Sequence, residues 1–263
     1  MTDRVDDRST LLEFALALAD AADAIALPAF LDGQAVRLKP DGTPVTDADT
    51  AVETMIRGQL AETYPEHGIL GEELGTTGAP DSPRWIIDPI DGTVNFTRGI
   101  PIWATLIAFE EGGELQVAVI SMPAIGQRWY ASRGGGTTAV QLGRERAVRV
   151  SSVSSLADAH VVHAGVGAML REGLSPGFVD ILRDAARDRG FGDALGYTLV
   201  AQGSADVMVE TAVKPWDLAA PALIITEAGG RFTRVDGSEG HDGPTALATN
   251  GHLHDEVLAR LRG

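Results

Sequence analysis

Two carboxylates and a hydroxyl stand close together in RWIIDPIDGTVNF, residues 84–96. Asp88 and Asp91 follow an apolar run that is typical of a buried strand, and Pro89 between them cannot donate to a sheet. Buried carboxylates repel each other, and a hard divalent cation such as Mg²⁺ removes that repulsion. Thr93 begins a predicted helical turn whose free N–H groups can hold a phosphate. The segment therefore predicts a site for metal and phosphate, with a simple strand-closing turn as the alternative.

Three further acidic motifs lie at predicted strand ends or helix starts: DAD at 47–49, GEE at 71–73 and PWDLAA at 215–220. Each has a structural explanation when it is taken alone. Asp49 can cap a helix, and Asp217 can be a first-turn acid that the helix dipole favours. The case for a shared site comes from the four motifs together.

In this order, the four motifs resemble the inositol monophosphatase family of Mg²⁺-dependent phosphatases. The resemblance runs from Lys39 to Gly230, and WIIDPIDGTVNF and PWDLAA…EAGG are its most specific parts. It implies hydrolysis of a small phosphate monoester by metal-activated water, without a phosphoenzyme. It also implies two or three Mg²⁺ ions in the site, with Mn²⁺ as the alternative metal. Clustered carboxylates and one hydroxyl suffice for such chemistry, because the metals activate water and stabilise the leaving alkoxide.

The resemblance also implies a role for each matching residue. The implied metal ligands are Glu72, Asp88, the backbone carbonyl of Ile90, Asp91 and Asp217. The implied catalytic residues are Glu72, Thr93 and Asp49, with Thr93 and Asp49 paired to orient the attacking water. Gly92 and Thr93 are the implied phosphate-binding backbone.

A narrower resemblance concerns the segment RGFGDALGYTLVAQGSAD, residues 189–206. Arg189, Asp193 and Tyr197 in this segment make it similar to the actinobacterial and plant-type histidinol-phosphate phosphatases of the same family. The implied reaction converts L-histidinol phosphate to L-histidinol and phosphate in histidine biosynthesis. The implied substrate-binding residues are Arg189, Asp193 and Glu210, in addition to the phosphate-binding backbone.

The two acids have a chemical rationale as substrate selectors. Histidinol phosphate carries an ammonium and an imidazole, and Asp193 and Glu210 can form charge-assisted hydrogen bonds with them. As an alternative, Asp193 only caps the next helix. Inositol 1-phosphate or another small-alcohol phosphate is the alternative substrate, and a metal-binding regulatory protein without turnover is the more distant alternative function. Val94 departs from the family pattern, which commonly has a polar or basic residue there.

Composition narrows the class of protein. The chain has 263 residues, 44% of them hydrophobic, and a formal net charge of −16. So acidic a chain argues against nucleic acid as a partner, which requires clustered lysine and arginine. It contains no cysteine, the N-terminal MTDRVDDRST lacks a signal-peptide pattern, and no apolar run approaches transmembrane length. We therefore expect a cytoplasmic enzyme with no membrane partner, and the resemblance implies a homodimer.

The elements that position these residues follow from periodicity and turn signals. A first helix is expected from Ser9 or Thr10 to about Pro28, and segments 103–109, 115–121 and 127–132 are expected to form an antiparallel meander. The HLH run at 252–254 is expected on a surface helix.

A change of pattern marks the middle of the chain. SSVSS at 151–155 predicts a junction between an N-terminal α+β half, 1–150, with a largely antiparallel sheet, and a C-terminal α/β half, 151–263. The resemblance implies a layered αβαβα sandwich with the active site between the halves.

Overall fold

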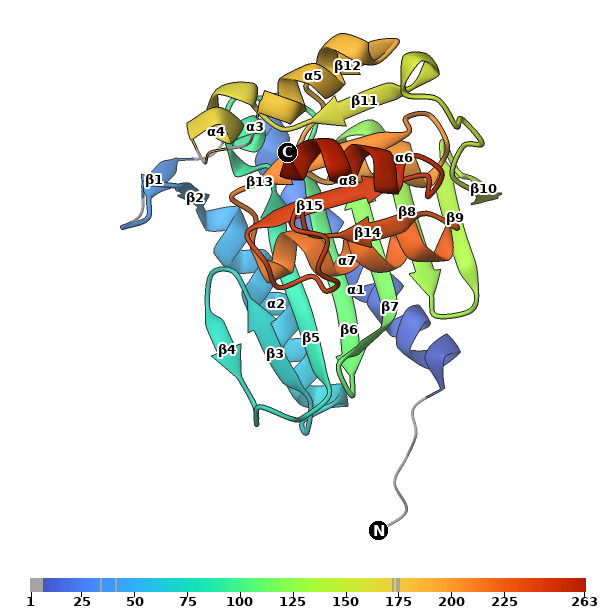
Figure 1. The fold of residues 1–263 in the computed structure, drawn as a ribbon. Helices are drawn as coiled ribbons and strands as arrows, with labels where there is room; N and C mark the ends of the chain where they lie inside the picture. The colour runs from blue at the N-terminus through green and yellow to red at the C-terminus, as the bar shows by residue number, and fades with distance from the viewer. Residues whose placement is uncertain (1–6, 34, 41, 172, 174–175) are drawn as a thin grey trace.

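The protein consists of alternating layers of helices and sheets (Figure 1). The computed structural model describes residues 7–33, 35–40, 42–171, 173 and 176–263. Helices α1 (Arg8–Asp32) and α2 (Asp47–Thr63) pack on one face of an eight-stranded sheet. Helices α6 (Asp193–Ala201) and α7 (Pro215–Glu227) lie between this sheet and a five-stranded sheet. A third layer of helices covers the far face of the smaller sheet, and the predicted αβαβα sandwich is confirmed.

The larger sheet has the strand order β10-β9-β8-β7-β6-β5-β3-β4. Neighbouring strands are antiparallel except for the parallel pair β3–β5, and the predicted meander is confirmed as β6, β7 and β8. The strands are β3 (Gly68–Gly71), β4 (Gly75–Thr77), β5 (Arg84–Asp91), β6 (Ala104–Glu111), β7 (Glu114–Met122), β8 (Gln127–Ser132), β9 (Gly136–Gln141) and β10 (Arg144–Val148).

The smaller sheet is mixed, with the order β12-β11-β13-β15-β14. Strand β11 is parallel to β12 and β13, and the remaining pairs are antiparallel. Its strands are β11 (His160–His163), β12 (Arg187–Arg189), β13 (Val207–Thr211), β14 (Arg231–Thr233) and β15 (Thr245–Thr249). The other elements are the β1–β2 hairpin (Val36–Leu38, Pro44–Thr46), α3 (Thr93–Thr97), the outer helices α4 (Val166–Arg171), α5 (Pro176–Asp184) and α8 (His254–Arg262), and the 3₁₀ turns Pro123–Ile125 and Leu156–Asp158.

Strand β5 is covered on both faces, which explains its continuous apolar run. Trp85 and Ile87 belong to the core formed with α1 and α2, which includes Val52 and Ile56. Ile86 belongs to the core formed with α6 and α7 on the opposite face. The end of β5, where the two predicted ligand acids lie, is therefore enclosed by protein.

Helix α1 differs from its prediction in two ways. It begins after Asp7, whose carboxylate accepts the N–H of Ser9, and it continues through Pro28 to Asp32. Its last turn is held by tertiary packing, since the ring of Phe30 lies 5.6 Å from those of Phe96 and Trp103. Proline costs a helix one hydrogen bond, and this packing offsets the cost.

The expectation that no segment approaches transmembrane length is wrong for α1. By length and composition, α1 is the one helix in the described part of the chain that could cross a membrane. In the structure its buried stripe of leucine and alanine packs against α2 and the larger sheet. Such a composition is shared by core helices and membrane spans, and here the helix is part of the core.

His254 begins α8, an outer helix, so the expectation that the HLH run belongs to a surface helix holds for the helix but not for this side chain. The His254 side chain is fully buried at the start of α8, and α8 covers the outer face of the smaller sheet. Each ring nitrogen lies 3.0 Å from a threonine hydroxyl, Nε2 from that of Thr233 and Nδ1 from that of Thr249. Burial, with a smaller contribution from Arg231, lowers the pKa of His254 to about 4. The imidazole is therefore neutral in the folded protein at neutral pH.

We expect His254→Gln to reduce the loss of stability on acidification. A pKa lowered on folding favours the folded state above pH 6.5, and this contribution is lost as the pH falls toward about 4. Urea unfolding above about pH 6.5 and below about pH 4 gives the drop in the free energy of unfolding on acidification. This drop should be larger in the wild type than in the variant by roughly 2 to 3 kcal/mol. His252→Gln, at an exposed position of the same run, is the control and should behave as wild type. Equal pH dependence of wild type and His254→Gln would contradict the assignment.

Candidate active site

Strand β5 brings two predicted ligand acids to one place. Asp88 is 2% exposed and Asp91 is 8% exposed. Residues three apart on a regular strand point to opposite faces of the sheet. The pairing of β5 with β6 is irregular between Asp88 and Asp91, and the two carboxylates reach the same site. The irregular backbone around Pro89 thus lets Asp88 and Asp91 point into the same site.

Helix α7 supplies the third acid. Asp217 lies in its first turn, where Oδ2 accepts the N–H of Lys214 at 2.8 Å. Carboxylate oxygens of Asp88, Asp91 and Asp217 lie within 4.8 Å of one another, and we call these residues the three-acid cluster. Asp217 therefore combines the helix-start role that the sequence offered as an alternative with a place in the cluster.

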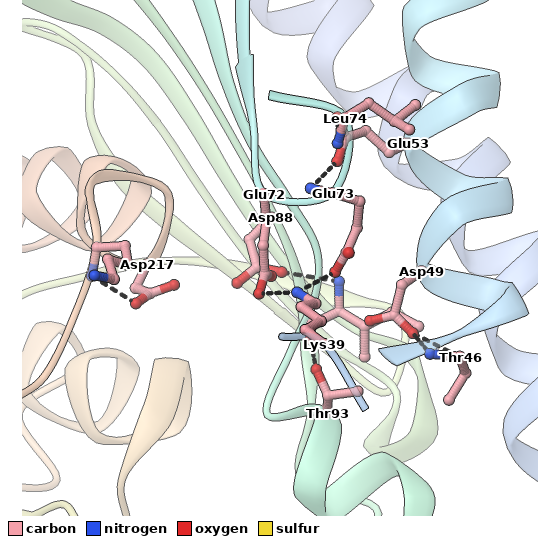
Figure 2. Close-up of polar contacts among 12 residues, drawn as sticks. Lys39, Thr46, Asp49, Glu53, Glu72, Glu73, Leu74, Asp88, Thr93 and Asp217 are labelled. Carbon is pink, nitrogen blue, oxygen red and sulfur yellow. Dashed lines mark hydrogen bonds and ion pairs between the residues drawn. The ribbon is translucent and has the colours of Figure 1, made fainter. Parts of the chain in front are cut away.

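Glu72 lies beside the cluster and shares a lysine with Glu73 (Figure 2). Lys39 Nζ lies 2.7 Å from Glu72 Oε1 and 2.7 Å from Glu73 Oε1. Burial lowers the pKa of Lys39, but the hydrogen bonds and charges of the two glutamates outweigh it and raise that pKa above its ordinary value. After burial, the charge of Glu72 is the largest influence that raises the pKa of Asp88. Glu72 thus contributes negative charge to the site while Lys39 partly balances it.

The expected pairing of Thr93 with Asp49 differs from the contacts that the structure gives (Figure 2). Thr93 Oγ1 donates to the carbonyl of Ile90 at 3.0 Å. Asp49 Oδ2 accepts the N–H and the hydroxyl of Thr46, which completes a capping box at the start of α2. Asp49 Oδ1 is buried without a hydrogen-bond partner among the described residues. Asp49 is therefore a helix cap in this structure and keeps one free oxygen.

A cavity of about 310 Å³ opens over the three-acid cluster. Most predicted site residues line it: Glu72, Asp88, Ile90, Asp91, Gly92, Thr93, Asp193, Glu210 and Asp217. Gly92 has φ 79°, and an added Cβ would lie 3.2 Å from the carbonyl oxygen of Ile102 and 3.3 Å from Asp193 Oδ2. This position therefore requires glycine both for its backbone conformation and for its close packing.

Asp193 and Glu210, the two acids predicted to select the substrate, both line the cavity and contact each other. Glu210, on β13, accepts the Tyr197 hydroxyl at 2.8 Å and the N–H of Asp193 at 3.2 Å. Asp193 has φ 55°, and Gly192 before it is the N-cap residue. The Asp193 side chain accepts a hydrogen bond from Asn95 Nδ2 at 3.1 Å, a donor outside its own helix. The alternative that Asp193 is only a helix cap does not describe this geometry.

Arg189 is the predicted substrate-binding residue that the structure keeps apart from the cavity. It is exposed on edge strand β12, and its guanidinium donates to the backbone carbonyl of Asp188 at 2.6 Å. Arg189 is absent from the cavity lining, which contains Ala164 and Asp193 from the neighbouring segments.

Burial and mutual repulsion make the cavity acids hard to ionise. Burial, followed by the charges of neighbouring acids, raises the pKa values of Asp88 and Asp91 well above their usual range. Burial also raises the pKa of Asp217 to about 7 and that of Glu210 to about 8. A buried set of oxygen donors with this repulsion fits a hard divalent cation, which would compensate the charges and favour the ionised forms. The three-acid cluster can therefore bind a metal.

Comparisons with known proteins agree with this geometry. Residues 7–262 match the inositol monophosphatase family. The chain belongs to the inositol monophosphatase family. As a member of this family it is a phosphoric monoester hydrolase, and the predicted class of enzyme is confirmed.

Relatives of this phosphatase include two that carry the name histidinol-phosphatase. The protein from Mycobacterium tuberculosis is 47% identical, with 95% of this chain and 97% of the relative covered. The protein from Streptomyces coelicolor is 44% identical, with 99% of this chain and 98% of the relative covered. Among solved structures, the Thermotoga maritima IMPase has a TM-score of 0.85 and 29% identity, with 96% of this chain and 97% of that chain covered. The predicted resemblance, at family level and to histidinol-phosphatases, is confirmed.

The sequence prediction overlooked Glu53, a fully buried acid that holds the segment carrying Glu72 (Figure 2). Glu53 lies on α2 and accepts the backbone N–H groups of Glu73 at 2.7 Å and of Leu74 at 3.1 Å. A Cβ at Gly71 would lie 2.1 Å from Glu53 Oε1, so only glycine allows this approach. The available signal was an acid beside the apolar positions of α2, paired at i+4 with Arg57. Glu53 positions the phosphatase's predicted ligand Glu72 without reaching the cavity itself.

We expect Glu53→Gln to weaken metal binding by the phosphatase about 10- to 100-fold, as losses of groups that orient ligands typically do. The amide would place an N–H₂ group against backbone N–H donors, which also costs about 1 to 3 kcal/mol of stability. Calorimetric titration with Mg²⁺ measures the first effect and urea unfolding measures the second. Glu62→Gln, at an exposed position of the same helix, is the control. Wild-type Mg²⁺ affinity in Glu53→Gln would contradict the positioning role.

Proposed function

We propose that this phosphatase hydrolyses L-histidinol phosphate to L-histidinol and phosphate in histidine biosynthesis, with Mg²⁺ as its metal. The observation that carries the proposal is the placement of Asp193 and Glu210 in the same cavity as the three-acid cluster. A metal ion held by the three-acid cluster would bind the phosphate group of a substrate. Asp193 and Glu210 would bind a positively charged alcohol. The names of the two relatives described above support the same choice of substrate.

The charge of the substrate distinguishes this proposal from its alternative. Histidinol carries an ammonium group and an imidazole, and hydrogen bonds between such cations and carboxylates are stronger than those between neutral groups. Inositol offers hydroxyl groups alone, which can donate hydrogen bonds to Glu210 but bring no positive charge to balance the two acids. Inositol 1-phosphate or another small-alcohol phosphate remains the alternative substrate, which the family name supports.

We propose Glu72, Asp88, the Ile90 carbonyl, Asp91 and Asp217 as the ligands of two or three Mg²⁺ ions, with Mn²⁺ as the alternative metal. Bound Mg²⁺ would activate water, neutralise phosphate charge and stabilise the leaving oxygen. The backbone at Gly92 and Thr93 would hold the phosphate, because Gly92 in its left-handed conformation turns the chain into α3. Thr93 and Asp49 would orient the water, for which the Thr93 hydroxyl must leave the carbonyl of Ile90.

The remaining assignments rest on the family resemblance and on composition. We propose a cytoplasmic homodimer that acts on a small-molecule ester, with neither nucleic acid nor membrane as a partner. We also propose the division into halves 1–150 and 151–263; the larger sheet ends at Val148 and the smaller sheet begins at His160. Arg189 stays a proposed substrate contact that would require movement of β12.

We expect Asp193→Asn to lower kcat/KM for L-histidinol phosphate by about 10- to 100-fold, as the loss of one charge-assisted hydrogen bond typically does. The same variant should gain or keep activity on inositol 1-phosphate, so the ratio between the two esters is the quantity to measure. Asp188→Asn removes an exposed charge from nearby β12 and serves as the control for net charge. An unchanged ratio in Asp193→Asn would contradict the role of this acid in choosing the substrate.

A further inference from the structure

Asn95 connects α3, the short helix that follows Asp91, to Asp193. Its side-chain Nδ2 donates to the carbonyl oxygen of Ile102 at 2.9 Å and to Asp193 Oδ2 at 3.1 Å. Because both acceptors are oxygens, the amide must present its nitrogen to them, which fixes its orientation. Asn95, on α3, is thus anchored to the loop that follows its helix and reaches the first residue of α6.

The Asp193 backbone is held as firmly as its side chain. The residue adopts φ 55°, a left-handed conformation that is uncommon outside glycine. Its N–H donates to Glu210 Oε1 at 3.2 Å, and the next N–H, of Ala194, donates to Asp91 Oδ2 at 2.8 Å. Strained backbone of this kind persists where the surroundings over-determine it, and it is concentrated at functional sites. Among the described residues, Asn95 donates to the Asp193 side chain, and this bond fixes the direction of the carboxylate.

The kind of donor matters as much as its position. Glu72 and Glu73 share the ammonium of Lys39, which partly neutralises them. Asp193 instead receives a neutral amide, so its negative charge stays available to a ligand in the cavity that it lines. A neutral donor orients a carboxylate without cancelling the attraction that a cationic ligand needs.

We propose that Asn95 is a positioning residue that sets the preference for a cationic phosphate ester by fixing the Asp193 carboxylate. This inference rests on the function proposed above, in which Asp193 contacts the cationic alcohol. A carboxylate that must find its direction on binding loses affinity for the ordering of its rotamer. Removal of Asn95 should therefore act on KM for the cationic ester more than on kcat.

The test is a double-mutant cycle in which the ratio of kcat/KM for L-histidinol phosphate to that for inositol 1-phosphate is measured. We expect Asn95→Ala to lower this ratio about five- to tenfold, and Asn95→Ala combined with Asp193→Asn to match Asp193→Asn alone, because the two residues act as a unit. The control is Thr97→Val on the same helix, which removes a hydroxyl that donates to the Val94 carbonyl. Asn95→Gln, which keeps the N–H groups on a longer stem, should also lower the ratio and replaces Asn95→Ala if that variant is insoluble.

Three results separate this inference from the proposed function. A wild-type enzyme that does not prefer L-histidinol phosphate would overturn the proposed function itself. A wild-type preference that survives in Asn95→Ala or Asn95→Gln would overturn the positioning role alone. The two single variants could also lower the kcat/KM ratio by factors that multiply in the double variant. Asn95 would then act independently of Asp193, which also overturns the inference.

Discussion

Asp91→Asn is expected to lower kcat for phosphate release by at least about a thousandfold, because it would remove a proposed ligand of the metal, and a catalytic metal stabilises transition-state charge by several kcal/mol. The same change should stabilise the metal-free protein by about 1 to 3 kcal/mol, since it removes the cost of burying, beside other acids, a carboxyl group that ionises freely in the unfolded chain. Burial and then the charge of Asp193 are the largest influences on the raised pKa of Asp91. Asparagine keeps an oxygen for the N–H of Ala194, so the local fold should survive.

Opposite changes in activity and stability are the signature of a charged binding site. Activity with saturating Mg²⁺ and urea unfolding with EDTA measure the two effects on one preparation. Asp81→Asn, in the exposed loop before β5, is the control and should change neither quantity. Activity within tenfold of wild type, or a metal-free Asp91→Asn protein less stable than wild type, would contradict the assignment of Asp91 to the metal site.

The metal-free protein is expected to lose stability as the pH rises from neutral. The pKa of Glu210 is raised from 4.5 to about 8 and that of Asp217 from 3.8 to about 7. A carboxyl group with a raised pKa binds more protons in the folded state than in the unfolded state at pH values between its two pKa values. Its contribution to stability is therefore complete below the unfolded-state pKa and is lost as the pH rises through the folded-state pKa. Between about pH 6.5 and about pH 8.5 the loss should reach roughly 2 kcal/mol or more.

Mg²⁺ should reverse this trend. Metal binds the ionised carboxylates and displaces their protons, so its affinity rises with pH. We expect saturating Mg²⁺ to stabilise the protein by at least about 3 kcal/mol near pH 8.5 and by clearly less near pH 6.5. Urea unfolding with EDTA and with Mg²⁺, each at about pH 6.5 and at about pH 8.5, measures the four free energies of unfolding that are compared. A metal-free protein that gains stability over this range, or a Mg²⁺ effect independent of pH, would contradict the cluster's electrostatics.

The three-acid cluster and Glu72 could be predicted because their signals are local. An apolar run that ends in carboxylates around a proline, as at Asp88 and Asp91, predicts both the strand and the site at its end. Asp217 likewise carries a helix-start signal in its own sequence neighbourhood. The predicted pairing of Thr93 with Asp49 depended on side-chain rotamers, and the structure gives each of them another partner.

Residues whose role depends on distant segments escaped prediction. Glu53 contacts backbone twenty positions along the chain, and Asn95 reaches Asp193, which lies 98 positions away. Neither spacing has a periodicity that a sequence reveals. The HLH run was expected on a surface helix, yet threonine hydroxyls of strands β14 and β15 satisfy the His254 nitrogens and allow the burial of its side chain. Pro28 was expected to end α1, and aromatic packing of Phe30 overrides that local preference.

Phosphate release from L-histidinol phosphate and from inositol 1-phosphate, measured side by side with Mg²⁺ and with EDTA, tests the proposed metal dependence and substrate preference together. We expect rapid release from L-histidinol phosphate with Mg²⁺, much slower release from inositol 1-phosphate, and none from either ester with EDTA. Release that persists in EDTA would contradict the metal site. A preference for inositol 1-phosphate would contradict the choice of a cationic alcohol as the leaving group.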